Sequence, residues 1–177
     1  MIQKTLLVFL MLASFSMMFL SERPIYFAVP LWGLLSSLSF FDFKALRLPN
    51  ILTALVLCLG IAYNIYIDKN LLLPLTSFLI SSALLIIISL TYYKLRGRLG
   101  LGMGDIKLFA AGAVWLSPYQ LPFVLLISSL TAILYFLISF ERVNVAATNQ
   151  KIPYGPFLAI AIWSVWLSGD YLIRLLQ

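Results

Sequence analysis

Long apolar stretches separated by short polar breaks run along almost the whole chain. None shows the strict alternation of a transmembrane barrel strand, and helices satisfy their own backbone hydrogen bonds inside a bilayer. A helix needs about 20 residues to cross the hydrocarbon layer. The pattern predicts an all-α, polytopic helical membrane bundle of about seven transmembrane helices, over residues 5–20, 25–41, 51–67, 71–93, 106–116, 119–140 and 154–176.

The first stretch, residues 1–20, has two interpretations. Lys4 followed by an apolar region is also typical of a signal peptide, but no small-x-small cleavage site directly follows it. A retained first span or signal anchor is therefore favoured. Its removal would leave six spans facing the same way, and either way we expect residues 1–177 to form a single integral membrane domain.

Composition supports a lipid-embedded chain and removes several kinds of chemistry. Apolar residues make up 63% of the sequence, whereas charged residues make up only 10%. The absence of histidine excludes Ser-His-Asp triads and H-E-x-x-H zinc sites. The single cysteine, Cys58, excludes an intrachain disulfide and a cysteine zinc site. We therefore expect no metal and no cofactor.

The basic residues indicate the orientation of the chain. The net charge is +6, but the cations are scattered between apolar stretches, so we expect no nucleic-acid partner. One side of the predicted bundle receives three of them, Arg23, Lys69 and Arg174. The other side receives nine, which are Lys4, Lys44, Arg47, Lys94, Arg96, Arg98, Lys107, Arg142 and Lys151. The positive-inside rule makes that side cytoplasmic and places the amino terminus inside.

The stretch over residues 106–116 is too short to cross a bilayer. Eleven helical residues rise by roughly 17 Å, whereas the hydrocarbon layer is about 30 Å thick. A glycine-rich segment, residues 100–104, precedes it. Irregular backbone at membrane depth is tolerated only against protein or a water-filled cavity. We therefore infer a hydrated cleft that opens to the cytoplasm beside Asp105.

Two of the six acidic residues are placed unusually. Asp42 directly follows an apolar stretch and Asp105 begins the short one, and ionisable groups at membrane depth are functional-site candidates. Two predicted crossings separate them, so both lie at the same end of the bundle. Two carboxyls in a desolvated site share one proton, which allows aspartic-peptidase chemistry. Alternatively, each could neutralise a nearby cation, Lys44 or Lys107, or anchor a helix end.

Three motifs extend this hypothesis. Residues 42–50 read D-x-K-x-x-R-L-P-N, residues 102–108 read G-x-G-D-x-K-L, and residues 152–159 read I-P-Y-G-P-F-L-A. Together and in this order they resemble the type IV prepilin peptidases, which belong to the G-x-G-D intramembrane aspartyl proteases. The resemblance covers residues 25–170, which we expect to be the peptidase core.

The resemblance implies roles for individual positions. Asp42 and Asp105 match the two catalytic aspartates, and Gly102 and Gly104 match the second motif. We expect these glycines to let the backbone turn sharply and approach a substrate closely.

Other motif positions are expected to support the site. They are Lys44, Lys107, Pro49, Asn50, Pro153, Gly155 and Pro156. Pro49 and Asn50 fit a helix restart with Asn50 as a possible N-cap. The last motif predicts either a rigid re-entrant segment lining the cleft or an ordinary helix start with proline in its first turn.

The resemblance also implies a substrate and a location. The substrate would be a prepilin or pseudopilin, with a short basic leader ending in glycine and a following apolar helix. Cleavage would occur at the cytoplasmic face of the bacterial inner membrane, where we expect the basic loops to hold anionic lipid. Longer family members carry a zinc-binding insert after the first span and methylate the new terminus. Here residues 21–24 stand in that place, which predicts a short, peptidase-only form and puts methyltransferase activity in doubt.

Two alternatives remain. Lipoprotein signal peptidases are also small two-aspartate membrane enzymes, but they work at the outer face, against the charge count. The other is a non-enzymatic membrane component of a pilus or secretion assembly, or a transporter-like protein with structural aspartates. The sequence leaves the oligomeric state open.

Overall fold

The computed structural model describes residues 23–67, 70–97, 100–140 and 153–174. Every regular element in these ranges is helical. The α-helices are α2 (Ile25–Ala45), α3 (Asn50–Ile67), α4 (Leu72–Arg96), α5 (Met103–Ala113), α6 (Leu121–Phe140) and α7 (Gly155–Arg174), and a 3-10 turn, η2 (Pro118–Gln120), precedes α6. The all-α prediction is confirmed, while the first predicted span, residues 5–20, lies outside the described residues.

Within the described ranges, four segments are long and apolar enough to cross a membrane. They are Ile25–Ala45, Asn50–Ile67, Leu72–Arg96 and Pro118–Leu137. Gly155–Ser168 in α7 is a shorter apolar segment. The expected short helix is present as α5, with 11 residues, and it begins three residues earlier than predicted. The α2 helix is longer than predicted and continues past Asp42 to Ala45.

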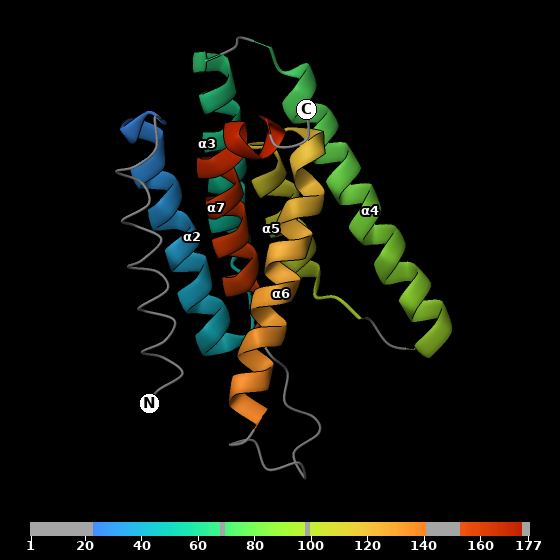
Figure 1. The fold of residues 1–177 in the computed structure, drawn as a ribbon. Helices are drawn as coiled ribbons and strands as arrows, with labels where there is room; N and C mark the ends of the chain where they lie inside the picture. Colours follow the sequence, from blue (N-terminus) through green and yellow to red (C-terminus); the bar gives the residue numbers. More distant parts are fainter. Residues whose placement is uncertain (1–22, 68–69, 98–99, 141–152, 175–177) are drawn as a thin grey trace.

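The helices lie along one another as a bundle, and α5 occupies its interior (Figure 1). It packs against α3, α4 and α7, while α7 also packs against α2 and α6. The carboxyl end of α2 and the amino ends of α3, α5 and α7 meet at the lower end of Figure 1, which we call the site end. This topology brings Asp42, Asp105 and the start of α7 to one end of the bundle.

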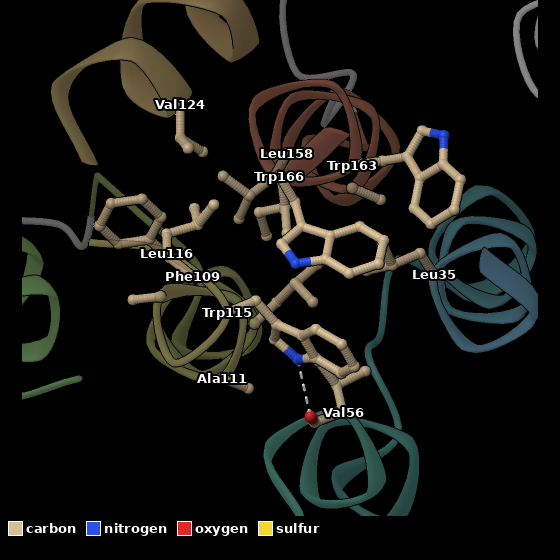
Figure 2. Packing of buried hydrophobic residues seen from close by; sticks show 14 of the residues in the cluster. Leu35, Val56, Phe109, Ala111, Trp115, Leu116, Val124, Leu158, Trp163 and Trp166 are labelled. Atoms are coloured by element: carbon tan, nitrogen blue, oxygen red, sulfur yellow. Dashed lines mark hydrogen bonds between the residues drawn. The ribbon is translucent and has the colours of Figure 1, made fainter. Parts of the chain in front are cut away.

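Buried aromatic residues connect α3, α7 and the segment that directly follows α5. The rings of Tyr63 and Trp115 are stacked with centroids 5.1 Å apart, and Trp166 meets both edge-on. The indole N–H of Trp115 donates a 3.0 Å hydrogen bond to the carbonyl of Val56 (Figure 2). Aromatic pairs contribute about 0.5–1.5 kcal/mol each beyond their burial. This cluster fixes α5 and α7 against α3 away from the site end.

Side chains of neighbouring helices donate hydrogen bonds to the backbone carbonyls that follow the end of α5 inside the bundle. The amide of Asn64 in α3 donates to the carbonyl of Val114 at 2.9 Å. The hydroxyl of Ser77 in α4 donates to the carbonyl of Leu116 at 2.7 Å. Carbonyls left unpaired at membrane depth are costly, so these bonds allow a half-length helix to end there.

Candidate active site

The end of α2 places Asp42. Leu31, Leu35, Leu38 and Asp42 follow the spacing of one helix face and are all buried, so the carboxylate continues the stripe that packs into the bundle. Its side chain is only 5% exposed. The helix then ends at Leu46, which adopts the left-handed conformation (φ 52°) and donates its N–H to the carbonyl of Asp42 at 2.8 Å. A leucine at positive φ is strained, and such strain is concentrated at functional sites.

The start of α7 holds the carboxylate of Asp42. The backbone N–H of Gly155 donates to Asp42 Oδ2 at 2.9 Å. Gly155 is the first residue of α7, so the positive end of the helix dipole also faces the carboxylate. A Cβ on Gly155 would lie 2.8 Å from Asp42 Oδ2, closer than a real Cβ contact. Glycine at this position is therefore required by the close approach of Asp42.

The first turn of α5 places Asp105. The carbonyl of Gly102 accepts hydrogen bonds from the backbone N–H groups of Asp105 (3.1 Å) and Ile106 (3.3 Å). A Cβ on Gly102 would lie 2.9 Å from Asp105 Oδ2. Asp105 itself is half-buried.

The expectation that the G-x-G-D motif needs the backbone freedom of glycine is wrong at Gly102, while the expected close approach to a substrate stays a prediction. Gly102 has φ −70° and ψ 139°, which any residue adopts. Gly97 is the only glycine with positive φ in the described ranges. A Cβ on Gly104 would lie 3.1 Å from the side chain of Leu48. The glycines of the motif thus serve close packing rather than unusual backbone angles.

Both aspartates line one cavity of about 310 Å³, which we call the aspartate cavity. The end of α2 and residues 46–48 form one side, Asn50 begins α3, and residues 102–105 with Lys107 form the other side. The predicted meeting of Asp42 and Asp105 at one end of the bundle is confirmed. Asp105 lies outside the four candidate spans, and burial together with the negative charge of Asp42 raises the pKa of Asp105 to about 6.

The neighbouring lysines do not neutralise the aspartates. Within the described ranges, no ion pair joins Asp42 or Asp105 to Lys44 or Lys107. Lys107 Nζ donates instead to Asn50 Oδ1 at 3.0 Å, and both residues line the aspartate cavity. Lys44 is exposed on the last turn of α2 and does not line it.

The expected N-cap role of Asn50 is wrong. The carbonyl of Pro49 accepts the N–H of Thr53 at 3.2 Å, so Pro49 precedes the helix and Asn50 is its first residue. The amide oxygen of Asn50 is instead the acceptor for Lys107. Pro49 is half-buried and does not line the aspartate cavity.

The third motif forms a helix start rather than a re-entrant segment lining the cleft. Pro156 lies in the first turn of α7 and Tyr154 caps the turn, because its carbonyl accepts the N–H groups of Phe157 and Leu158. Pro153, Gly155 and Pro156 do not line the aspartate cavity, but the N–H of Gly155 donates to Asp42. The ordinary helix start was thus the correct alternative.

Sequence reasoning missed Leu46, Arg47, Leu48 and Met103, which line the cavity. The first three lie inside the D-x-K-x-x-R-L-P-N motif and Met103 lies inside the G-x-G-D motif, so the motifs themselves were the available signal. In the part of the chain that the structure describes, no three His, Cys, Asp or Glu side chains form a metal-ligand cluster. The two carboxyls lie in one cavity, so one of them can hold a proton while the other accepts one.

Comparison with known proteins gives a consistent set of relatives. The type IV leader peptidase family model matches residues 28–137, a range that includes both aspartates. A "Prepilin leader peptidase/N-methyltransferase" of Aeromonas salmonicida (strain A449) is 36% identical over 151 residues, covering 83% of this chain and 50% of that protein. The protein of the same name from Legionella pneumophila is 35% identical over 153 residues, covering 84% of this chain and 52% of its own length.

A third relative of that name, from Pseudomonas aeruginosa, is 32% identical over 148 residues, covering 81% of this chain and 49% of its own. The chain thus spans about half the length of the curated relatives that it matches. No solved structure matches the chain significantly.

Proposed function

This chain belongs to the type IV leader peptidase family, and from that premise we propose that it is a membrane-embedded aspartic endopeptidase that removes the leader from prepilin or pseudopilin precursors. The observation that carries the proposal is the presence of Asp42 and Asp105 in one cavity. The names of the relatives support the substrate class.

The surroundings of the two aspartates support different roles for them. The Gly155 N–H and the amino end of α7 stabilise a negative charge on Asp42, which supports its role as the general base. Asp105, whose pKa is raised to about 6, is the partner that holds the proton.

Hydrolysis follows from these roles. Water attacks the scissile carbonyl carbon and gives a proton to Asp42, while Asp105 gives its proton to the carbonyl oxygen. The tetrahedral diol then collapses, because Asp42 passes its proton to the leaving amine as the C–N bond breaks and Asp105 takes its proton back. The enzyme ends in its starting protonation state.

Location and membrane orientation are part of the same proposal. The helices long and apolar enough to span make this an integral membrane protein. The excess of Lys and Arg on the side of Lys44 and Lys94 supports an amino terminus inside the cell and a cytoplasmic aspartate cavity in the bacterial inner membrane. A cleft on that face suits a substrate whose basic leader stays in the cytoplasm. Residues 25–170 are the proposed peptidase core, and anionic lipid is the proposed partner of the basic loops.

Co-expression with a prepilin tests this function. Asp42→Asn and Asp105→Asn should each abolish processing on a gel, because each removes one partner in the proton exchange. Asp68→Asn, which removes an acid predicted to lie at the opposite face, should process normally. All variants are compared for their amounts in the membrane. Full processing by either site variant refutes the assignment of that residue, and failure of the purified wild-type protein to cleave any prepilin favours the non-enzymatic alternative.

A further inference from the structure

An apolar furrow runs between α3 and α4. These helices are consecutive in the chain, yet each packs on α5 and they make almost no contact with each other. In Figure 1 the carboxyl end of α4 lies well away from the other helices, and residues 91–97 are all exposed. With α5 as its floor and α3 and α4 as its walls, the furrow opens sideways toward the surrounding lipid. We call it the α3–α4 groove.

The groove consists of two neighbouring hollows. The hollow near the site end has a volume of about 420 Å³, and Ala54 and Ile106 are among its lining residues. The second has about 270 Å³ and reaches Ile61 and Leu71. Leu57 and Phe78 line both hollows, so the two lie next to each other.

The groove adjoins the aspartate cavity, at a junction where Lys107 Nζ donates to Asn50 Oδ1. Asn50, Met103 and Lys107 line both the first hollow and that cavity. From Asn50 to Ile61 the groove follows eleven residue steps of α3, or roughly 16 Å, which is about three helical turns. An elongated apolar object in the groove would therefore present one end to Asp42 and Asp105.

The lining of the groove offers no free polar group at its centre. The Thr53 hydroxyl donates to the carbonyl of Asn50 at 2.9 Å, and the Ser82 hydroxyl donates to the carbonyl of Phe78 at 2.6 Å. An occupant must therefore be apolar along its length and satisfy its own backbone, as only a helix does in lipid.

We propose that the α3–α4 groove binds the apolar helix of the substrate that follows the scissile bond, entering sideways from the bilayer. This inference rests on the proposed function. The position of the groove directly beside the aspartate cavity favours a substrate helix over a lipid chain, because only a substrate needs one end near the carboxyls. The helix lies with its face on α5, as apolar helices do in hydrophobic grooves, and its amino end delivers the peptide bond to the aspartates.

Filling the groove tests the proposal on two substrates. Ala54 lines the groove and is exposed, so Ala54→Phe adds bulk without disturbing the packed interior. Ala62→Phe is the matched control, because Ala62 is an exposed residue of α3 that lines neither hollow. We expect Ala54→Phe to lower kcat/KM at least tenfold for a prepilin with its apolar helix. Cleavage of a soluble peptide that ends before the helix should stay within about twofold, and Ala62→Phe should affect neither substrate.

Cross-linking tests binding without cleavage. In a Cys58→Ser background carrying Asp105→Asn, Ala54→Cys should form a disulfide under mild oxidation with a cysteine placed in the apolar helix of the prepilin. Ala62→Cys should not.

The outcomes separate the two proposals. Normal cleavage of the full prepilin by Ala54→Phe, or equal cross-linking at both positions, overturns the groove proposal, and lipid is then its occupant. Loss of cleavage of both substrates, with no cross-link at position 54, also overturns it. Failure of the wild-type protein to cleave either substrate refutes the proposed function instead, and the cross-link still decides whether the helix binds.

Discussion

Gly155→Ala changes the site through a single added carbon. That Cβ would lie 2.8 Å from Asp42 Oδ2 and 3.1 Å from its Cγ, whereas ordinary contacts begin near 3.4 Å. The carboxylate must therefore retreat by about 0.6 Å, which stretches its 2.9 Å hydrogen bond with the Gly155 N–H toward the limit of hydrogen bonding and weakens it. A hydrogen bond to a charged group contributes about 1.5–3 kcal/mol. Since about 1.4 kcal/mol corresponds to a tenfold change in rate, we expect kcat to fall about 10- to 100-fold.

The assay is cleavage of a prepilin by the purified protein in liposomes, with kcat and KM measured separately. KM should change little, because Gly155 does not line the aspartate cavity. Gly33→Ala is the matched control, since a Cβ at Gly33 has nothing within 4 Å. Thermal unfolding of both variants reports any loss of fold. An unchanged kcat in Gly155→Ala would show that the position of Asp42 against α7 does not matter for catalysis.

Three further predictions concern stability. Asp105 holds its proton more tightly in the folded protein than in the unfolded chain, so folding stability should fall as the pH rises from about 4 to about 6. Asp105→Asn should remove this loss. The Tm difference between the variant and the wild type should therefore grow between pH 4 and pH 7. Asn64→Leu leaves the carbonyl of Val114 unpaired and should lower stability by about 1–3 kcal/mol, measured by denaturant unfolding in detergent, and an unchanged midpoint would contradict the role of this bond. Gly112→Ala places its Cβ against the side chain of Ile162 and should cost about 1–3 kcal/mol, which Ile162→Ala in the same chain should partly restore; additive losses in the double variant would contradict this contact.

The positions of the helices along the sequence were predictable, because the hydropathy of a segment depends only on its own residues. The amino ends of α3 and α7 differ from the predicted stretches by one residue each, and α5 has the predicted length. The carboxyl end of α2 was predicted less accurately, because the apolar stretch stops before Asp42 while the helix continues to Ala45. That error concealed the fact that Asp42 lies on the buried stripe of α2 rather than beyond its end.

The partners of the site residues were not predictable in the same way. Lys107 follows Asp105 by two residues, which suggested an ion pair, yet its ammonium reaches Asn50 on another helix. Gly155 was expected either to line the cleft or to begin a helix, and neither alternative predicted that its N–H donates to Asp42. Residues two apart on a helix point in different directions, so closeness in sequence is a poor guide to contact.

The sequence by itself determined that the protein is embedded in lipid, that it is helical, and that the two aspartates meet at one end of the bundle. These follow from apolar length, from the need to satisfy backbone groups in lipid, and from the even number of crossings between Asp42 and Asp105. Only the tertiary structure decided how α7 holds Asp42, how Asn50 binds Lys107, and that α3 and α4 stand apart over α5. The reason is physical: the rotation and tilt of each helix depend on the side chains of all its neighbours at once, whereas hydropathy records only how each segment prefers lipid to water.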